Sequence, residues 1–382
     1  MVGNSTKERD ALKDIVGVCA GQTAAVSFSV LSPLVIGGLI ISFDVGEAAV
    51  GGLITLELLI VGVTSIALAP LITRLSLRWL AITGVAIMII CNLLSAEVSA
   101  FTELYSLRLA AAIGGGISVA TANAAIARGR VPVFLYGVSW AAVYVCTSPV
   151  AVAMSQNELS YPGAIRWCAL LLIVALPLLW LLPRGEQERS AAASAFGTNV
   201  IGCVLLAGMA LMGSSMMAYY AFVERLADAS GASSAVRGMV VVGVYIGGII
   251  GGAIAAPVAA RFGIARALLM AVVLHAVAII VAVVTRDVLV LGIAAFCEAV
   301  IFIAMIALML ALAAEIDQAG RWAAAGAGAL VLSSAVGPLL GGVLIESIGY
   351  GFLGWLQILV GIPTLFLFTW AGRSISRLSR AV

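Results

Sequence analysis

The sequence predicts an all-α membrane protein in which twelve transmembrane helices form two pseudo-symmetric six-helix bundles. Three observations predict this fold class. Of the 382 residues, 63% are hydrophobic and only 10% are charged, against roughly 45–50% and about 25% in an average soluble domain. The apolar residues form long continuous runs, and one loop pattern occurs twice, about half a chain length apart.

The same composition excludes several classes of protein. A chain this apolar could not cover the surface of a soluble enzyme or a nucleic-acid-binding protein with polar groups. Disordered chains have low hydrophobicity. The strands of a membrane β-barrel alternate between polar and apolar residues, whereas these runs are continuous. We therefore expect a lipid bilayer around the chain and no nucleic-acid partner.

Polar breaks divide the chain into twelve apolar runs, each close to the roughly 20 residues that a spanning helix needs. The first run lacks the short apolar region and cleavage site of a signal peptide, so we expect a retained first span. The predicted spans are 15–42, 48–72, 79–97, 101–127, 131–155, 164–183, 198–222, 236–258, 264–285, 288–314, 322–345 and 350–372.

Lysine and arginine are enriched in cytoplasmic loops, and this bias predicts the orientation. With the N-terminus inside, the inner segments hold 15 of the 20 Lys and Arg residues and the outer segments hold 4. The remaining residue, Arg108, lies within a span. Six of the seven tryptophans fall near span ends, as in an aromatic belt. We expect a multi-pass protein of a cell inner membrane with both termini in the cytoplasm.

A polar, Ala/Ser-rich segment at 184–197 lies near the middle of the chain and is predicted to be a cytoplasmic linker. It separates an N-terminal bundle, 1–183, from a C-terminal bundle, 198–382. An internal repeat supports this division: Ala69-Pro70 and Ala256-Pro257 lie 187 residues apart, each in an inner loop between the second and third spans of its half. Parallel repeats of six spans are a recurring architecture of secondary transporters.

At these loops the chain resembles the major facilitator superfamily, and the resemblance extends over the whole sequence. Arg74, Arg78, Arg261, Gly263 and Arg266 match the family's loop signature, although Thr73 and Ala260 stand where an acidic residue is usual. In the family this loop holds the two halves together in the outward-facing state. The resemblance therefore implies that the four arginines belong to gating loops without the usual acid.

Further segments resemble the drug:proton antiporter branch of this family. Arg108, followed by the small residues 110–116, resembles a fourth-helix motif whose arginine is linked to proton coupling. The segment 337–342 resembles the Gly-Pro motif of antiporters, and 161–167 resembles the stretch before their sixth helix.

Four ionisable residues lie well within the predicted spans: Glu57, Arg108, His275 and Glu298. Such residues are functional candidates by default, because burying them in a bilayer is costly. We expect Glu298, Glu57 and Arg108 to take part in proton coupling. The alternatives are a packing ion pair for Arg108 and Glu57, and a carboxyl hydrogen-bonded to a neighbouring helix for Glu298. His275 is expected to be a neutral, hydrogen-bonded residue on a scaffold helix rather than a proton switch.

Sparse polar and aromatic side chains within the spans predict a substrate-binding surface for an amphipathic solute. The alternative is that the tyrosines lie at the membrane interface and the serines bond to their own helices. The predicted substrate-binding residues are Arg108, Gln22, Ser29, Trp140, Tyr144, Tyr219, Tyr220 and Tyr245.

We expect no metal and no other cofactor. The six cysteines lie in apolar runs without a CxxC pair, and a single histidine cannot build a multi-histidine site. Met209, Met212, Met216 and Met217 offer thioethers that suit Cu(I), but flexible apolar lining is the favoured interpretation.

Together these observations predict a secondary active transporter that exports a small amphipathic organic compound by alternating access, coupled to protons. The alternative is proton-coupled uptake of a small organic anion, in which Arg108 binds the carboxylate. We do not expect an enzyme, because the inner loops offer no nucleophile with a base, nor ATP-driven transport, because no Walker loop is present. We expect a monomer.

Overall fold

The computed structural model describes residues 2–45, 47–156, 160–182, 199–317 and 319–381. Every regular element in these ranges is a helix. Twelve of the described helices are long and apolar enough to cross a membrane. The predicted all-α class with twelve spans is therefore confirmed, whereas the predicted orientation stays a prediction.

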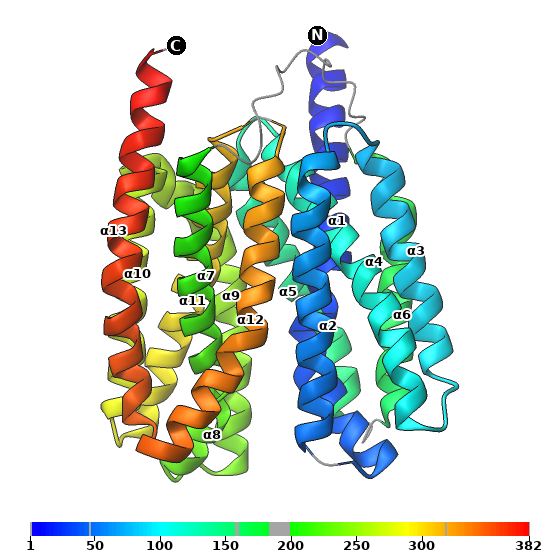
Figure 1. The fold of residues 1–382 in the computed structure, drawn as a ribbon, viewed down its shortest axis with the longest axis vertical. Coiled ribbons are helices and arrows are strands. Elements are labelled where there is room, and N and C mark those ends of the chain that lie inside the picture. Colours follow the sequence, from blue (N-terminus) through cyan, green and yellow to red (C-terminus); the bar gives the residue numbers. More distant parts are fainter. Residues whose placement is uncertain (1, 46, 157–159, 183–198, 318, 382) are drawn as a thin grey trace. The chain divides into compact units, whose positions relative to one another are not determined.

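Contacts between residues divide the chain into two compact units. Unit 1 comprises Met1–Arg130, Ala142–Ser194 and Ala319–Gly328, and unit 2 comprises Val131–Ala141, Ala195–Gln318 and Ala329–Val382. In Figure 1 most of unit 1 is coloured blue to teal and most of unit 2 green to red. The predicted linker at 184–197 lies outside the described residues, so the domain boundary there stays a prediction.

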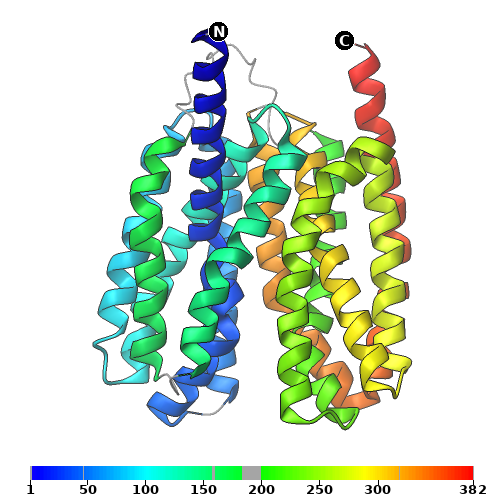
Figure 2. The ribbon, with the colours of Figure 1, turned by 180° about the vertical axis from the view of Figure 1, so that it is seen from behind.

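The helices of unit 1 follow the predicted spans, with differences at their ends. α1 begins ten residues before its apolar window at Leu12 and extends beyond the neighbouring helices (Figure 2). Pro70 lacks a backbone N–H, so α2 gives way there to a short 3-10 turn, η1. The elements are α1 (Val2–Phe43), α2 (Glu47–Leu68), η1 (Ala69–Leu71), α3 (Leu77–Ser95), α4 (Phe101–Ala127), α5 (Pro132–Gln156), α6 (Tyr161–Leu178) and η2 (Leu179–Leu181).

Unit 2 contains a short helix, α8, that the hydropathy pattern does not predict. The Asn199 and Asp287 side chains accept hydrogen bonds from the first backbone N–H groups of α7 and α11, which fixes where these helices begin. Gly263, with φ +80°, ends α9. The elements are α7 (Val200–Tyr220), α8 (Val223–Ala229), α9 (Ser234–Phe262), α10 (Ile264–Val284), α11 (Val288–Ala314), α12 (Arg321–Ile348) and α13 (Gly351–Ala381).

Two helices, α5 and α12, are each divided between the two units. α5 passes from unit 2 to unit 1 at Ala142, and α12 passes from unit 1 to unit 2 at Ala329. These positions are 187 residues apart, the same offset as Pro70 and Pro257 in the sequence repeat. The packing of the helices therefore repeats with the period that the loops show.

The first turns of α12 pack within unit 1 against α2 and α4. Ser65 Oγ donates a hydrogen bond to the Ala324 carbonyl (3.1 Å), and Arg128 Nε donates to the Ala319 carbonyl (3.1 Å). A Cβ on Gly328 would lie 2.8 Å from Ile66, so a glycine there lets α12 approach α2 closely.

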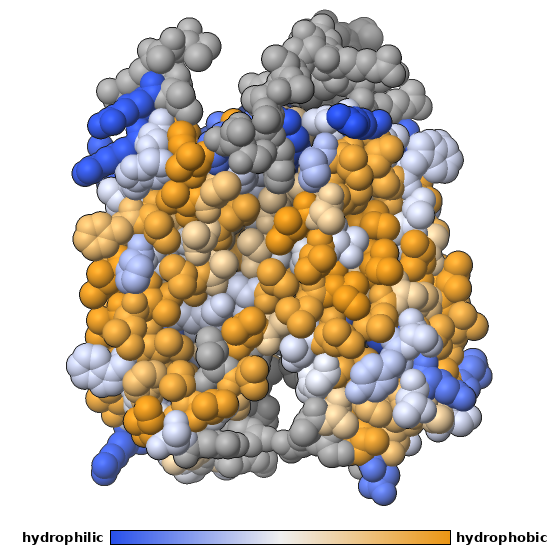
Figure 3. Space-filling model, in the orientation of Figure 1, coloured by the Kyte–Doolittle hydropathy of each residue, from blue (hydrophilic) through white to orange (hydrophobic). Residues whose placement is uncertain are grey.

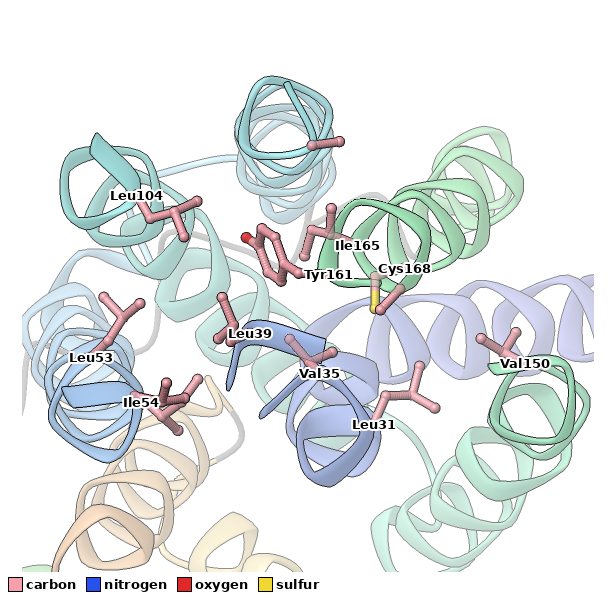
Figure 4. Packing of buried hydrophobic residues seen from close by; sticks show 13 residues of the cluster. Leu31, Val35, Leu39, Leu53, Ile54, Leu104, Val150, Tyr161, Ile165 and Cys168 are labelled. Atoms are coloured by element: carbon pink, nitrogen blue, oxygen red, sulfur yellow. The ribbon is translucent and has the colours of Figure 1, made fainter. Parts of the chain in front are cut away.

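Each unit has a hydrophobic core of its own. In unit 1 the Tyr161 ring lies among Leu39, Leu104 and Ile165 (Figure 4). In unit 2 the corresponding cluster joins the ends of α7, α9, α10 and α11 with α8. Figure 3 shows apolar residues over the middle of the visible face of each unit and hydrophilic residues near its ends, as expected for lipid contact.

Candidate functional site

A buried ion pair joins two helices of unit 1. Arg108 of α4 and Glu57 of α2 are 3% and 4% exposed. The guanidinium binds both carboxylate oxygens: Nε donates to Oε2 at 3.1 Å, and Nη2 donates to Oε1. This two-bond arrangement is the strong form of an arginine–carboxylate pair, and it leaves the pair without net charge.

Three further helices complete the surroundings of the Arg108 guanidinium. Asn92 of α3, which is also buried, accepts a hydrogen bond from Nη1 at 2.7 Å. The Phe28 ring of α1 lies 4.4 Å from the guanidinium carbon. Tyr161 and Cys168 of α6 lie within electrostatic range of the same group. The positive charge is thus balanced inside unit 1 by an anion, an amide and an aromatic face.

Glycines on α4 explain why these side chains meet. A Cβ on Gly114 would lie 2.6 Å from the Gly84 carbonyl of α3, and one on Gly116 would lie 2.5 Å from Thr64 Cβ of α2. Larger residues at these positions would push α2 and α3 away from α4. The small residues that follow Arg108 in the sequence therefore bring its carboxylate and amide partners within reach.

Unit 2 holds a second buried pair. His275 of α10 and Glu298 of α11 have exposed side-chain fractions of 0% and 2%, and His275 Nδ1 lies 3.3 Å from Glu298 Oε1. Neither ring nitrogen, nor Glu298 Oε1, has a well-formed hydrogen bond among the described residues. The two groups lie within reach of a hydrogen bond, and no described side chain makes a well-formed hydrogen bond to these three atoms.

The packing of α11 directs Glu298 toward α10. A Cβ on Gly247 of α9 would lie 2.8 Å from the Phe296 carbonyl, and Gly251 contacts α11 one turn further on, at Val300. That face of α11 is therefore held against α9. Glu298 is two residues from both Phe296 and Val300 and lies on a different face, where it meets His275.

The predicted polar lining of unit 1 divides into buried and exposed residues. Gln22 is buried, and its Oε1 has no hydrogen bond among the described residues. Tyr144 is also buried, and its carbonyl accepts a hydrogen bond from Ser148 Oγ at 2.5 Å. Ser29 is exposed, and its carbonyl accepts from Ser32 Oγ. The hydroxyls of Ser148 and Ser32 thus bond within their own helices, and Ser29 takes part through its carbonyl alone in this contact.

Aromatic residues of unit 2 gather around Glu298. Tyr219 is buried, its hydroxyl is unpaired among the described groups, and it lies within electrostatic range of Glu298. Tyr220 stacks on Phe302 with ring centroids 5.9 Å apart and an interplanar angle of 5°. Tyr245 lies near Tyr220 and is half-buried. Trp140 is half-buried in the part of α5 that belongs to unit 2.

Of the four loop arginines, Arg78 makes the most extensive contacts that the structure gives. Its Nη2 donates to the Leu182 carbonyl at 2.7 Å, and its guanidinium lies 5.0 Å from the Trp180 ring centroid, both within unit 1. Arg74, Arg261 and Arg266 are exposed.

Four residues with contacts in these regions were not predicted from the sequence. Arg128 donates to the Ile72 carbonyl at 3.2 Å and to the Ala319 carbonyl. Asn92 could have been found from its amide in an otherwise apolar run, whereas the hydropathy pattern does not distinguish Phe28 and Phe302 from lipid-facing residues. The structure brings Glu57 and Arg108 together and pairs Glu298 with His275.

Solved structures with the same fold identify the fold class of this chain. The chain has the fold of the major facilitator transporters, although its sequence matches no protein-family model and no curated protein at a significant level. Of the similar structures, the proton:xylose symporter XylE with bound 6-bromo-6-deoxy-D-glucose has a TM-score of 0.77 at 14% identity, over 95% of this chain and 96% of that one.

Two further structures have the same fold over nearly their full length. The human organic anion transporter MFSD10 (TETRAN) has a TM-score of 0.73 at 14% identity, over 93% of this chain and 99% of its own. The E. coli fucose:proton symporter FucP has a TM-score of 0.71 at 12% identity, over 94% and 98%. At these identities the likeness defines the fold alone, and the two buried pairs are the evidence for how the protein could bind protons and substrate.

Proposed function

We propose that this protein is a secondary active transporter, which moves a small organic compound across a membrane by alternating access and couples this movement to protons. The observation that carries the proposal is the presence of two buried carboxyls, Glu57 and Glu298, each beside a basic partner inside the spans. Acidic residues at this depth are costly, and in transporters they commonly bind protons or substrates.

The favoured substrate is a small amphipathic compound, and the favoured direction is export. The stacked rings of Tyr220 and Phe302, with the Tyr219 hydroxyl nearby, offer an apolar surface with a few polar groups, which suits such a solute. The antiporter-like segments at 161–167 and 337–342 support export. An inner-membrane location with cytoplasmic termini and a monomeric state belong to the same proposal.

Uptake of an organic anion is the second candidate, and the Arg108–Glu57 pair favours it. Arg108 keeps its charge at any physiological pH. If Glu57 takes up a proton, the guanidinium loses its counter-charge and can bind the carboxylate of a substrate instead. Proton and anion would then enter the site together. One of the similar folds belongs to a protein described as an organic anion transporter, and two belong to proton symporters.

A liposome experiment tests the proposal. Purified protein is first screened for thermal stabilisation by organic acids, amines, sugars and drugs, and the stabilising compound is then used in counterflow and in flux driven by an imposed pH gradient. We expect a pH gradient to drive transport and Glu298→Gln to abolish that dependence. Glu103→Gln, which changes an exposed acid at the start of α4, is the matched control.

The same assay distinguishes the two candidates. Arg108→Lys keeps the charge but loses the two-bond geometry. If the protein takes up an anion, this variant should weaken substrate affinity strongly and change the pH dependence of transport less. Export of an amphipathic compound predicts that Tyr220→Ala weakens affinity while pH dependence remains. Transport that ignores the pH gradient in the unaltered protein would contradict proton coupling in both candidates.

A further inference from the structure

The buried pair in unit 2 differs from an ordinary buried ion pair in having two titratable members. His275 Nδ1 and Glu298 Oε1 are 3.3 Å apart, and both side chains are shielded from solvent. A carboxylate beside a neutral imidazole would be a lone buried anion, and an imidazolium beside a protonated carboxyl would be a lone buried cation. Both are strongly disfavoured in apolar surroundings.

Only one protonation state leaves the pair without net charge. With one acidic proton between the two groups, the pair is either a neutral imidazole with a carboxylic acid or an imidazolium with a carboxylate. Ala295, one turn from Glu298, and Ile279, one turn from His275, are fully buried and apolar. These surroundings favour the one-proton state over states with no proton or two.

The described groups that face the pair add no competing charge. α7 contributes the hydroxyls of Tyr219 and Tyr220, and α9 contributes Tyr245 behind Tyr220. The arginines on the neighbouring helices α9, α10 and α13 whose side chains are described are exposed: Arg261, Arg266, Arg373 and Arg377. The charged side chains of α8 lie outside the described part of the structure.

We propose that His275 and Glu298 form a single proton-binding site, in which one proton is shared between Nδ1 and Oε1 as long as the pair is shielded from water. His275 is then a functional residue of unit 2 rather than a packing residue. The claim that this site couples protons to transport rests on the proposed function. The claim that the two residues share a proton is independent of that function.

The single histidine of the chain makes a direct test possible. The protein is produced with ¹³C- and ¹⁵N-labelled histidine and purified through a tag without histidine, so that every imidazole signal comes from His275. Spectra are recorded from about pH 5 to about pH 9 for the unaltered protein, Glu298→Gln and Glu103→Gln. A free histidine titrates near pH 6.5 in this range.

The expected result is a nearly constant imidazole signal in the unaltered protein, with the nitrogen shifts of a ring hydrogen-bonded through Nδ1. Glu298→Gln should change the signal to that of a neutral ring without this strong hydrogen bond. Glu103→Gln, which alters an exposed acid in unit 1, should leave the signal unchanged. A ring that titrates near pH 6.5, or a signal that Glu298→Gln does not alter, overturns the proposal.

Glu298→Asp provides a second variant in case the glutamine variant does not fold. It keeps the carboxyl and withdraws it by one methylene, so the shared hydrogen bond should weaken and the signal should move toward that of the neutral ring. An unchanged signal in a folded Glu298→Asp protein also overturns the proposal. If transport is independent of pH while the imidazole signal still shows the shared proton, the proposed coupling is refuted but the proton-binding site is not.

Discussion

Each unit places one buried carboxyl beside one basic residue, but the two basic residues differ in chemistry. In unit 1 the basic residue is Arg108, which stays protonated and binds Glu57 through two hydrogen bonds. In unit 2 the basic residue is His275, and its Nδ1 lies 3.3 Å from Glu298 Oε1. Unit 1 therefore holds an ion pair with two hydrogen bonds, whereas unit 2 holds a contact between two titratable side chains.

The largest expected effect comes from removing one member of the fixed pair. Arg108→Leu leaves Glu57 buried without a partner, and we expect it to lower the free energy of unfolding by about 3–5 kcal/mol. Thermal unfolding in detergent and size-exclusion profiles measure this loss. The double variant Arg108→Leu/Glu57→Leu removes both charges and should recover most of the stability. An Arg108→Leu protein as stable as the unaltered one would show that the pair does not form.

Matched changes of the two acids test the comparison directly. Glu57→Gln leaves a permanent buried cation, whereas Glu298→Gln leaves a neutral imidazole beside a neutral amide. We expect a loss of about 3–5 kcal/mol for the first and of about 1 kcal/mol for the second. Equal losses, measured by thermal unfolding at about pH 7, would mean that His275 carries a fixed positive charge and would contradict the distinction between the units.

Enlarging glycines at close helix contacts should lower the free energy of unfolding in both units by similar amounts, which are smaller than the loss expected for Arg108→Leu. Gly116→Ala forces a methyl group against Thr64 of α2, and Gly251→Ala forces one against the Val300 carbonyl of α11. Overpacking of this kind costs about 1–3 kcal/mol. Gly243→Ala is the control, because no atom of a neighbouring helix lies within 4 Å of its Cβ position. If the control is as unstable as the two variants, the close approach of the helices is not the cause.

The smallest expected effect lies at the end of unit 1. Arg78→Lys loses the planar contact with Trp180, which is worth about 0.5–1 kcal/mol at an exposed site. The exposed Arg74→Lys should leave the midpoint of thermal unfolding unchanged. A large loss in Arg78→Lys, or an equal loss in both variants, would point to a contact other than the ring.

Much of the fold could be predicted because it depends on local sequence. The predicted spans 101–127 and 288–314 match α4 and α11 residue for residue, since abrupt polar breaks flank both runs. The short helix α8 could not be predicted from hydropathy, because seven residues between two spans carry no periodic signal. The division of α5 and α12 between the units was also out of reach, because it depends on which helices pack together.

The candidate site was predicted in part. Burial of Glu57, Arg108, His275 and Glu298 followed from their positions in apolar runs, and the structure confirms it. Pairing was harder to predict, because Glu57 lies 51 residues from Arg108 along the chain and meets it through glycine contacts between three helices. The functional roles of these residues, and of the predicted substrate-binding tyrosines, stay predictions.

The sequence by itself determined that this chain spans a membrane, which segments form the spanning helices, and which charged groups fall within them, because long apolar runs partition into lipid regardless of what surrounds them. Only the tertiary structure decided that an arginine pairs with one acid and that a histidine lies beside the other. That choice depends on the faces that neighbouring helices present to each other, which close glycine contacts determine and which hydropathy along one chain does not encode.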